Sequence, residues 1–216
     1  MIPWEDHFER ERARYEDGAA RLPDAPDERQ RQLTRMGNAA GGAGLSLLMQ
    51  GWPDEAATWF ARAAERYRES FADAPPGSWG RPIGMIKGRV LAGDWPGAEQ
   101  DARFTLEHGA AEAESPVGRY AACLALLVLG RDAEARPLAD ALRIEDGFPH
   151  DVGDALATIA ADDRIGYVEA VESVLESFET RDEYLEDMPV ADTVIVLQAL
   201  AARRDLAAAV SSPLLP

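Results

Sequence analysis

The sequence is poor in the residues that build disulfides and metal sites. Among its 216 residues it has one cysteine, Cys123, and three histidines, His7, His108 and His150. A single cysteine excludes an intrachain disulfide and a multi-cysteine metal site. The histidines lie in different segments, and His7 and Glu11 form one pair at the helical spacing that points two ligands at one metal. We interpret that pair as a solvated helix face, and we predict no metal and no cofactor.

Long apolar stretches are missing as well. The longest runs from Tyr120 to Leu129 and is too short to cross a bilayer. The first residues, Met1–Asp6, have neither the basic head nor the apolar stretch of a signal peptide. We expect a cytoplasmic protein that does not bind membranes. The glycine-rich stretch Gly37–Gly44 lacks the Lys-Ser or Lys-Thr of a phosphate-binding loop, so we interpret it as a helix face for close packing.

Lysine is nearly absent, and acidic residues dominate the charge. There are 39 Asp and Glu against 22 Lys and Arg, which gives a net charge of −17, and Lys87 is the single lysine. A negative field disfavours nucleic acid and favours a basic partner. An acid excess with little lysine is also typical of a salt-adapted cytoplasm. The acidity therefore reflects either a basic partner or a salt-rich cytoplasm.

Almost every segment has the composition and the periodicity of an α-helix, and strict alternation is rare. Turn signals divide the chain into about ten helical segments, and short connections predict antiparallel neighbours within one domain, residues 1–216. An amphipathic helix is expected from Trp4 to Leu22, and Asp27 is expected to cap the next one. We predict that Val190–Ala201 is the most buried helix.

Three turns share one pattern. In each, an apolar helix ends in glycine and an alanine follows five residues later: Gly51 with Ala56, Gly93 with Ala98, and Gly130 with Ala135. Glycine can adopt the left-handed conformation that ends a helix. The small alanine would let the second helix approach the first. We therefore expect helical hairpins at these turns, with each alanine facing the preceding helix.

This pattern resembles the tetratricopeptide repeat. The resemblance is best over Asn38–Tyr67, where Gly44 and Phe60 occupy small and aromatic positions, and it is weaker over Ile83–His108 and Arg119–Arg143. The turns are unevenly spaced, so the stack is degenerate. The resemblance implies an all-α stack of antiparallel hairpins with a concave groove that binds a peptide or protein. An irregular helical bundle is the alternative.

The last part of the chain has a second resemblance. An amphipathic segment, Tyr167–Phe178, precedes the apolar helix and a tail that ends in Leu-Pro. This order is similar to the C-terminal third of the immunity protein 49 family of bacterial toxin–immunity systems. The resemblance implies a cytoplasmic protein that binds and blocks a toxin, often a basic nuclease. It assigns no functional residue to this chain.

We predict a non-catalytic module that binds a protein or peptide, with an immunity protein and an enzyme on a helical scaffold as alternatives. No serine or cysteine has the sequence frame of a catalytic nucleophile, so no catalytic residue is predicted. Partner binding is assigned to tryptophans near the turns, whose alternative role is packing between hairpins. It is also assigned to the acidic run before Met188, whose alternative role is a solvated connection between helices. The candidate residues are Trp52, Trp59, Trp95, Glu183, Glu186 and Asp187. The oligomeric state stays open.

Overall fold

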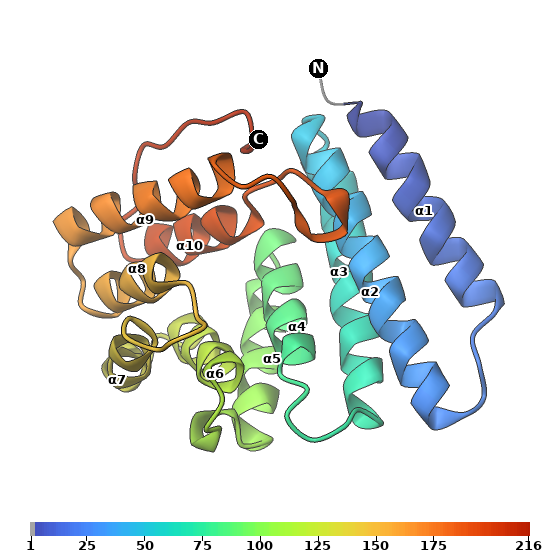
Figure 1. The fold of residues 1–216 in the computed structure, drawn as a ribbon, viewed down its shortest axis with the longest axis horizontal. Coiled ribbons are helices and arrows are strands. Elements are labelled where there is room, and N and C mark those ends of the chain that lie inside the picture. Colours follow the sequence, from blue (N-terminus) through green and yellow to red (C-terminus); the bar gives the residue numbers. More distant parts are fainter. Residues whose placement is uncertain (1–2) are drawn as a thin grey trace. The chain divides into compact units, whose positions relative to one another are not determined.

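The computed structural model describes residues 3–216, with the side chain of Leu185 excepted. Ten α-helices and two short 3-10 helices make up its regular structure, and no strand occurs in these residues, so the all-α prediction is confirmed (Figure 1). The described chain forms two compact units. Unit 1 contains residues 3–94, 183–190 and Pro216, and unit 2 contains residues 95–182 and 191–215. The single-domain assignment stays a prediction.

Unit 1 is a sequential stack of four helices. They are α1 (Trp4–Ala20), α2 (Pro26–Met49), α3 (Pro53–Ala72) and α4 (Gly80–Leu91). Consecutive helices of this unit pack against one another, with α2 between α1 and α3 (Figure 1). Asp27 does not cap α2, contrary to the prediction. The helix begins one residue earlier at Pro26, which needs no N–H partner at the first helical position.

The glycines of α2 allow its neighbours to approach closely. A methyl group at Gly44 would lie 2.6 Å from the ring of Phe60, and one at Gly37 would lie 2.8 Å from the ring of Tyr67. From the other side, α4 presents Gly84 to the same Tyr67 ring, where a methyl group would lie 2.5 Å away. Aromatic rings of α3 therefore fill space that glycines leave free. The packing interpretation of the glycine-rich stretch is confirmed.

The turn between α2 and α3 has the predicted chemistry. Gly51 has a φ of 80°, and the N–H of Trp52 donates to the carbonyl of Leu47 at 3.0 Å, which closes the end of α2. Ala56 is fully buried in a core cluster with Leu47 and Phe60. Small and large side chains thus alternate across this hairpin.

Unit 2 contains the remaining six α-helices. They are α5 (Trp95–Glu107), α6 (Pro116–Val128), α7 (Asp132–Leu142), α8 (His150–Ala160), α9 (Arg164–Glu179) and α10 (Asp192–Ala202), with a 3-10 turn at Ala110–Glu112. From α5 to α9 each helix packs against its successor, and α10 contacts α8 and α9. The most buried helix is α6, in which every residue from Ala121 to Val128 is buried. The prediction that the last helix is the most buried is therefore wrong.

The other two glycine turns also take the left-handed conformation. Gly93 and Gly130 each have a φ of 69°, and Ala98 and Ala135 are fully buried. Across the α6–α7 hairpin, the Cys123 thiol lies 3.8 Å from the carbonyl oxygen of Ala135. The two helices therefore lie close together at Ala135, and the burial of this alanine agrees with the repeat pattern.

One side chain makes several of the hydrogen bonds that hold the chain end to unit 2. Gln198 of α10 donates to the carbonyl of Ala208 at 2.5 Å and accepts from the N–H of Ala208 at 3.0 Å. The hydroxyl of Tyr167 on α9 donates to the same side-chain oxygen at 2.8 Å. A half-buried amide thus makes three hydrogen bonds, which link α9, α10 and the tail.

Candidate functional site

The two candidate tryptophans of unit 1 have different environments. Trp59 is 8% exposed and packs edge-on against Phe8 and Tyr15 of α1, with ring centroids 5.9 and 5.5 Å away. It belongs to the core. Trp52 precedes α3 and is 54% exposed, and it is the only aromatic among the large hydrophobic side chains exposed within residues 3–216. Of this pair, only Trp52 offers its ring to a partner.

Trp95 begins α5 in unit 2, where its ring is partly covered. The guanidinium of Arg203, just after α10, lies 4.3 Å from the ring centroid. This geometry is a cation–π contact. Trp95 therefore holds a cation in place, which is a different role from the exposed ring of Trp52.

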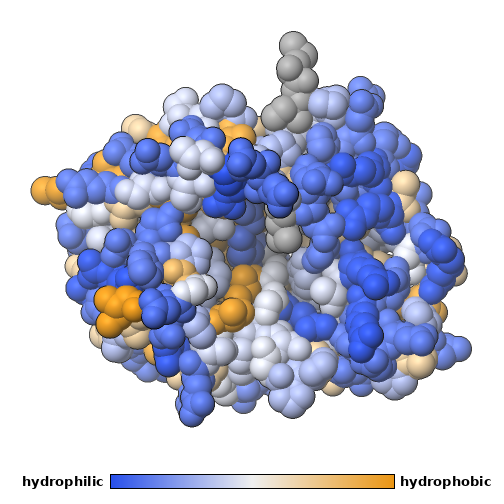
Figure 2. All heavy atoms as spheres, in the orientation of Figure 1, coloured by the Kyte–Doolittle hydropathy of each residue, from blue (hydrophilic) through white to orange (hydrophobic). Residues whose placement is uncertain are grey.

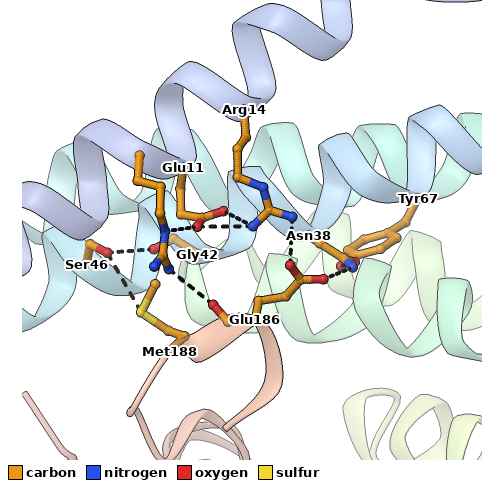
Figure 3. Close-up of polar contacts among 9 residues, drawn as sticks. Glu11, Arg14, Asn38, Gly42, Ser46, Tyr67, Glu186 and Met188 are labelled. Carbon is orange, nitrogen blue, oxygen red and sulfur yellow. Dashed lines mark hydrogen bonds and ion pairs between the residues drawn. The ribbon is translucent and has the colours of Figure 1, made fainter.

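The acidic run contains one residue that is used inside unit 1. Glu186 accepts hydrogen bonds from Arg14 at 2.7 Å and from the amide of Asn38 at 2.9 Å (Figure 3). Arg10 donates to the backbone carbonyl of Glu186 at 3.1 Å, and Tyr67 donates to the oxygen of Asn38 at 2.7 Å. Glu183 and Asp187 are exposed. The structure thus separates Glu186, which fastens the segment, from its two exposed neighbours.

Residues 183–190 are further held by buried apolar side chains. Met188 and Val190 are 5% and 3% exposed, and the Met188 sulfur lies 3.8 Å from the hydroxyl of Ser46 on α2 (Figure 3). Glu186 and Asp187 have φ values of 55° and 54°, a left-handed conformation that costs a non-glycine residue about 1 kcal/mol or more. The ionic hydrogen bonds and the buried side chains offset this cost.

The anchor of this network is Glu11, whose side chain is fully buried. It accepts from Arg10 at 2.8 Å and from Arg14 at 2.8 and 3.1 Å, so one buried carboxylate orients both arginines that hold Glu186. Gly42 makes room for it, since a methyl group there would lie 2.9 Å from the Glu11 side chain. The interpretation of Glu11 as part of a solvated face is therefore wrong. A signal existed, because Glu11 lies three residues after Phe8 and four before Tyr15, which places it on the same packed face of α1.

The charges around this network shift two pKa values. Burial alone would raise the pKa of Glu186, but hydrogen bonds from Arg14 and Asn38 outweigh it and hold that pKa below the usual range. Burial and then the charge of Arg10 lower the pKa of His7, although Asp187 acts in the opposite direction. Asp187 is therefore close enough to α1 for its charge to be felt there.

Exposed acids begin both α1 and α3, and two of them follow Trp52 closely in the sequence. The first turn of α3 carries Asp54 and Glu55, and the first turn of α1 carries Glu5 and Asp6. The contact of Phe8 with Trp59 brings these two helix starts to the same end of unit 1. We call the five exposed residues Glu5, Asp6, Trp52, Asp54 and Glu55 the acidic end of unit 1. Figure 2 shows a mainly hydrophilic surface over α1 and α2.

The residues that could carry metal or thiol chemistry are placed as follows. Within residues 3–216, no three His, Cys, Asp or Glu side chains group as metal ligands. Cys123 is fully buried, and burial, with the charge of Asp132, raises the pKa of its thiol to about 12. The interpretation of this cysteine as a buried apolar residue is confirmed. None of the described helices combines the length and the apolar character needed to cross a membrane.

No protein-family model, no curated protein and no solved structure matches the chain. The features that bear on function are therefore the acidic end of unit 1 and the Trp95–Arg203 contact of unit 2.

Proposed function

We propose that this chain is a non-catalytic binding module whose partner is a basic protein or peptide. The observation that supports it most is Trp52, an aromatic side chain 54% exposed and followed by the exposed acids Asp54 and Glu55. Tryptophan is the residue that most often dominates the energy of a protein interface. An exposed ring with acids beside it suits a partner that offers an apolar pocket edged by Arg or Lys.

The net charge gives this surface a long-range role. A chain of −17 attracts basic partners, and this attraction accelerates their association. Within residues 3–216, none of Glu5, Asp6, Asp54 and Glu55 forms an ion pair with a basic side chain. Their charge is therefore not cancelled locally. Glu11 and Cys123 have side chains that could serve catalysis, but both are fully buried in the protein.

The experiment compares partner capture by the wild-type chain and by Trp52→Ala. Ile144→Ala, which removes a side chain 82% exposed in unit 2, is the matched control for the loss of exposed apolar surface. We expect basic proteins captured by the wild type and by Ile144→Ala, but depleted with Trp52→Ala. Identical sets from all three proteins would contradict the proposal. A basic nuclease among the depleted proteins would favour the immunity-protein form of this function.

Kinetics on a captured partner separate the two contributions. Trp52→Ala should speed dissociation by about 30-fold, which corresponds to a hot spot of about 2 kcal/mol. The double variant Glu183→Gln, Asp187→Asn should instead slow association, and this effect should shrink as salt rises. Glu186 is left unchanged because it holds residues 183–190 in place. Equal effects of both variants on the association rate would contradict the separate roles given to Trp52 and to these two acids.

A further inference from the structure

Unit 2 contains a hollow of about 310 Å³ lined by an unusual set of charges for this chain. Its walls are the end of α6 with the glycine turn, the start of α7, and side chains of α5 and of the residues after α10. The charged lining residues are Glu99, Arg103, Asp132, Arg203 and Arg204. Three arginines against two acids leave a local positive excess in a protein whose net charge is −17.

The guanidinium of Arg204 uses its hydrogen-bond donors within the protein and has a structural role. Its guanidinium forms an ion pair with Asp132, and it donates to the carbonyls of Leu127 at 2.7 Å and Leu200 at 2.9 Å. The carbonyl of Leu127 belongs to the last turn of α6, the negative end of the helix dipole. Arg204 therefore neutralises both Asp132 and the helix end that faces the hollow.

Arg103 and Arg203 share a single carboxylate. One oxygen of Glu99 lies 3.1 Å from Arg103, and the other lies 3.8 Å from Arg203. Both guanidiniums are accessible, with side chains 58% and 39% exposed. Arg203 is oriented by its stacking on Trp95 at 4.3 Å. An arginine stacked on an aromatic face keeps its N–H edge free for the planar, two-point recognition of an oxyanion.

We propose that this hollow binds the phosphoryl group of a small molecule between Arg103 and Arg203. One Glu99 carboxylate supplies one negative charge to two cations, whereas a phosphate dianion supplies two. Glu99 occupies the position between the arginines when the ligand is absent, so it competes with the ligand. The hollow is of the size of a small-ligand pocket, which leaves space for the rest of a phosphate ester. This site lies in unit 2 and does not rest on the binding function proposed for unit 1.

The test is a titration of the full chain with inorganic phosphate and, separately, with glycerol 3-phosphate, at constant ionic strength. Binding is followed by NMR through the amide of Gly130, which lines the hollow, and through the indole N–H of Trp95, whose ring stacks against the lining residue Arg203. We expect both signals to shift in a saturable way with at least one probe. Tighter binding of the ester would identify a phosphorylated metabolite as the ligand class, and tighter binding of inorganic phosphate would identify the free ion. No saturable shift with either probe would overturn the proposal.

Three variants test the roles of the side chains. Arg203→Ala should weaken binding by about tenfold, as expected for the loss of one charge-assisted hydrogen bond. Glu99→Gln should tighten binding, because it removes the competing carboxylate, whereas a merely structural role for Glu99 predicts no tightening. Arg12→Ala, which removes an exposed arginine of unit 1 paired with Glu9, is the control for net charge. Weakening by Arg12→Ala equal to that by Arg203→Ala, or no tightening by Glu99→Gln, would overturn the proposal.

Discussion

Gly41 and Gly44 lie three residues apart on α2 and form a matched pair for testing the hairpin packing of unit 1. A methyl group at Gly41 would meet no atom within 4 Å, whereas one at Gly44 would lie 2.6 and 2.7 Å from two ring carbons of Phe60. Phe60 is 1% exposed, so its ring is enclosed by other protein atoms and would have to displace them in order to move. The same substitution at the two positions should therefore have opposite consequences.

The magnitudes follow from two general effects. Replacing glycine by alanine inside a helix stabilises it by about 0.8–1 kcal/mol. Gly41→Ala should raise the free energy of unfolding by about this amount, because nothing opposes it. Gly44→Ala has the same gain but overpacks a core contact at a cost of about 1–3 kcal/mol. The propensity gain cancels in the comparison, so the two variants should differ by about 1–3 kcal/mol.

Urea unfolding followed by tryptophan fluorescence measures both variants, since Trp59 adjoins Phe60 in the sequence and lies in the same core cluster. A double-mutant cycle with Phe60→Leu shows whether the ring is the cause. Gly44→Ala should cost less once the ring is gone, and the coupling should fall in the range of about 0.5–3 kcal/mol found for residues in contact. Equal stability of Gly41→Ala and Gly44→Ala would refute the register of α2 against α3.

Four further predictions concern packing, charge and titration. Ala56→Leu should lower the free energy of unfolding by about 1–3 kcal/mol, because Ala56 is fully buried, and an unchanged melting temperature would contradict the hairpin geometry. Salt should raise the melting temperature by screening the −17 charge, and a flat series would count against the salt-adapted interpretation. Since burial raises the thiol pKa of Cys123 from 9.0 to about 12, stability should fall as pH rises from 9 toward 12, and less so in Cys123→Ala. Since the pKa of Glu186 is lowered in the folded state, its contribution is complete above its unfolded pKa of 4.5 and is lost as pH falls through the folded pKa. Hydrogen-exchange protection of residues 183–190 should therefore decrease in acid and be low at all pH values in Glu186→Gln.

The turns were predictable because local chemistry determines them. Gly51, Gly93 and Gly130 adopt positive φ for a reason visible in a few residues: an apolar helix has to end, and glycine does so without a steric penalty. The buried face of α9 was predictable for a similar reason. Tyr167 and Phe178 recur with the helical period, and both are buried.

Burial of whole helices was less predictable, because it depends on which neighbours cover them. The last helix and α6 both have apolar sequences, but α6 packs against both α5 and α7, and its residues Ala121–Val128 are all buried. In α10, Ile195 and Ala199 stay partly exposed. Hydrophobic composition alone does not distinguish a helix covered on all sides from one at an edge.

The acidic run shows where sequence reasoning ends and three-dimensional structure is required. Glu183, Glu186 and Asp187 look equivalent in the sequence, and a run of acids is usually a solvated surface. Glu186 differs only because Arg14, 172 residues away in the chain, lies opposite it and is itself oriented by the buried Glu11. The partners of a charge in the folded chain therefore decide which acid holds the structure together and which acids are free to attract a partner. For this reason Glu183 and Asp187, and not Glu186, are the residues of this run to neutralise when partner binding is measured.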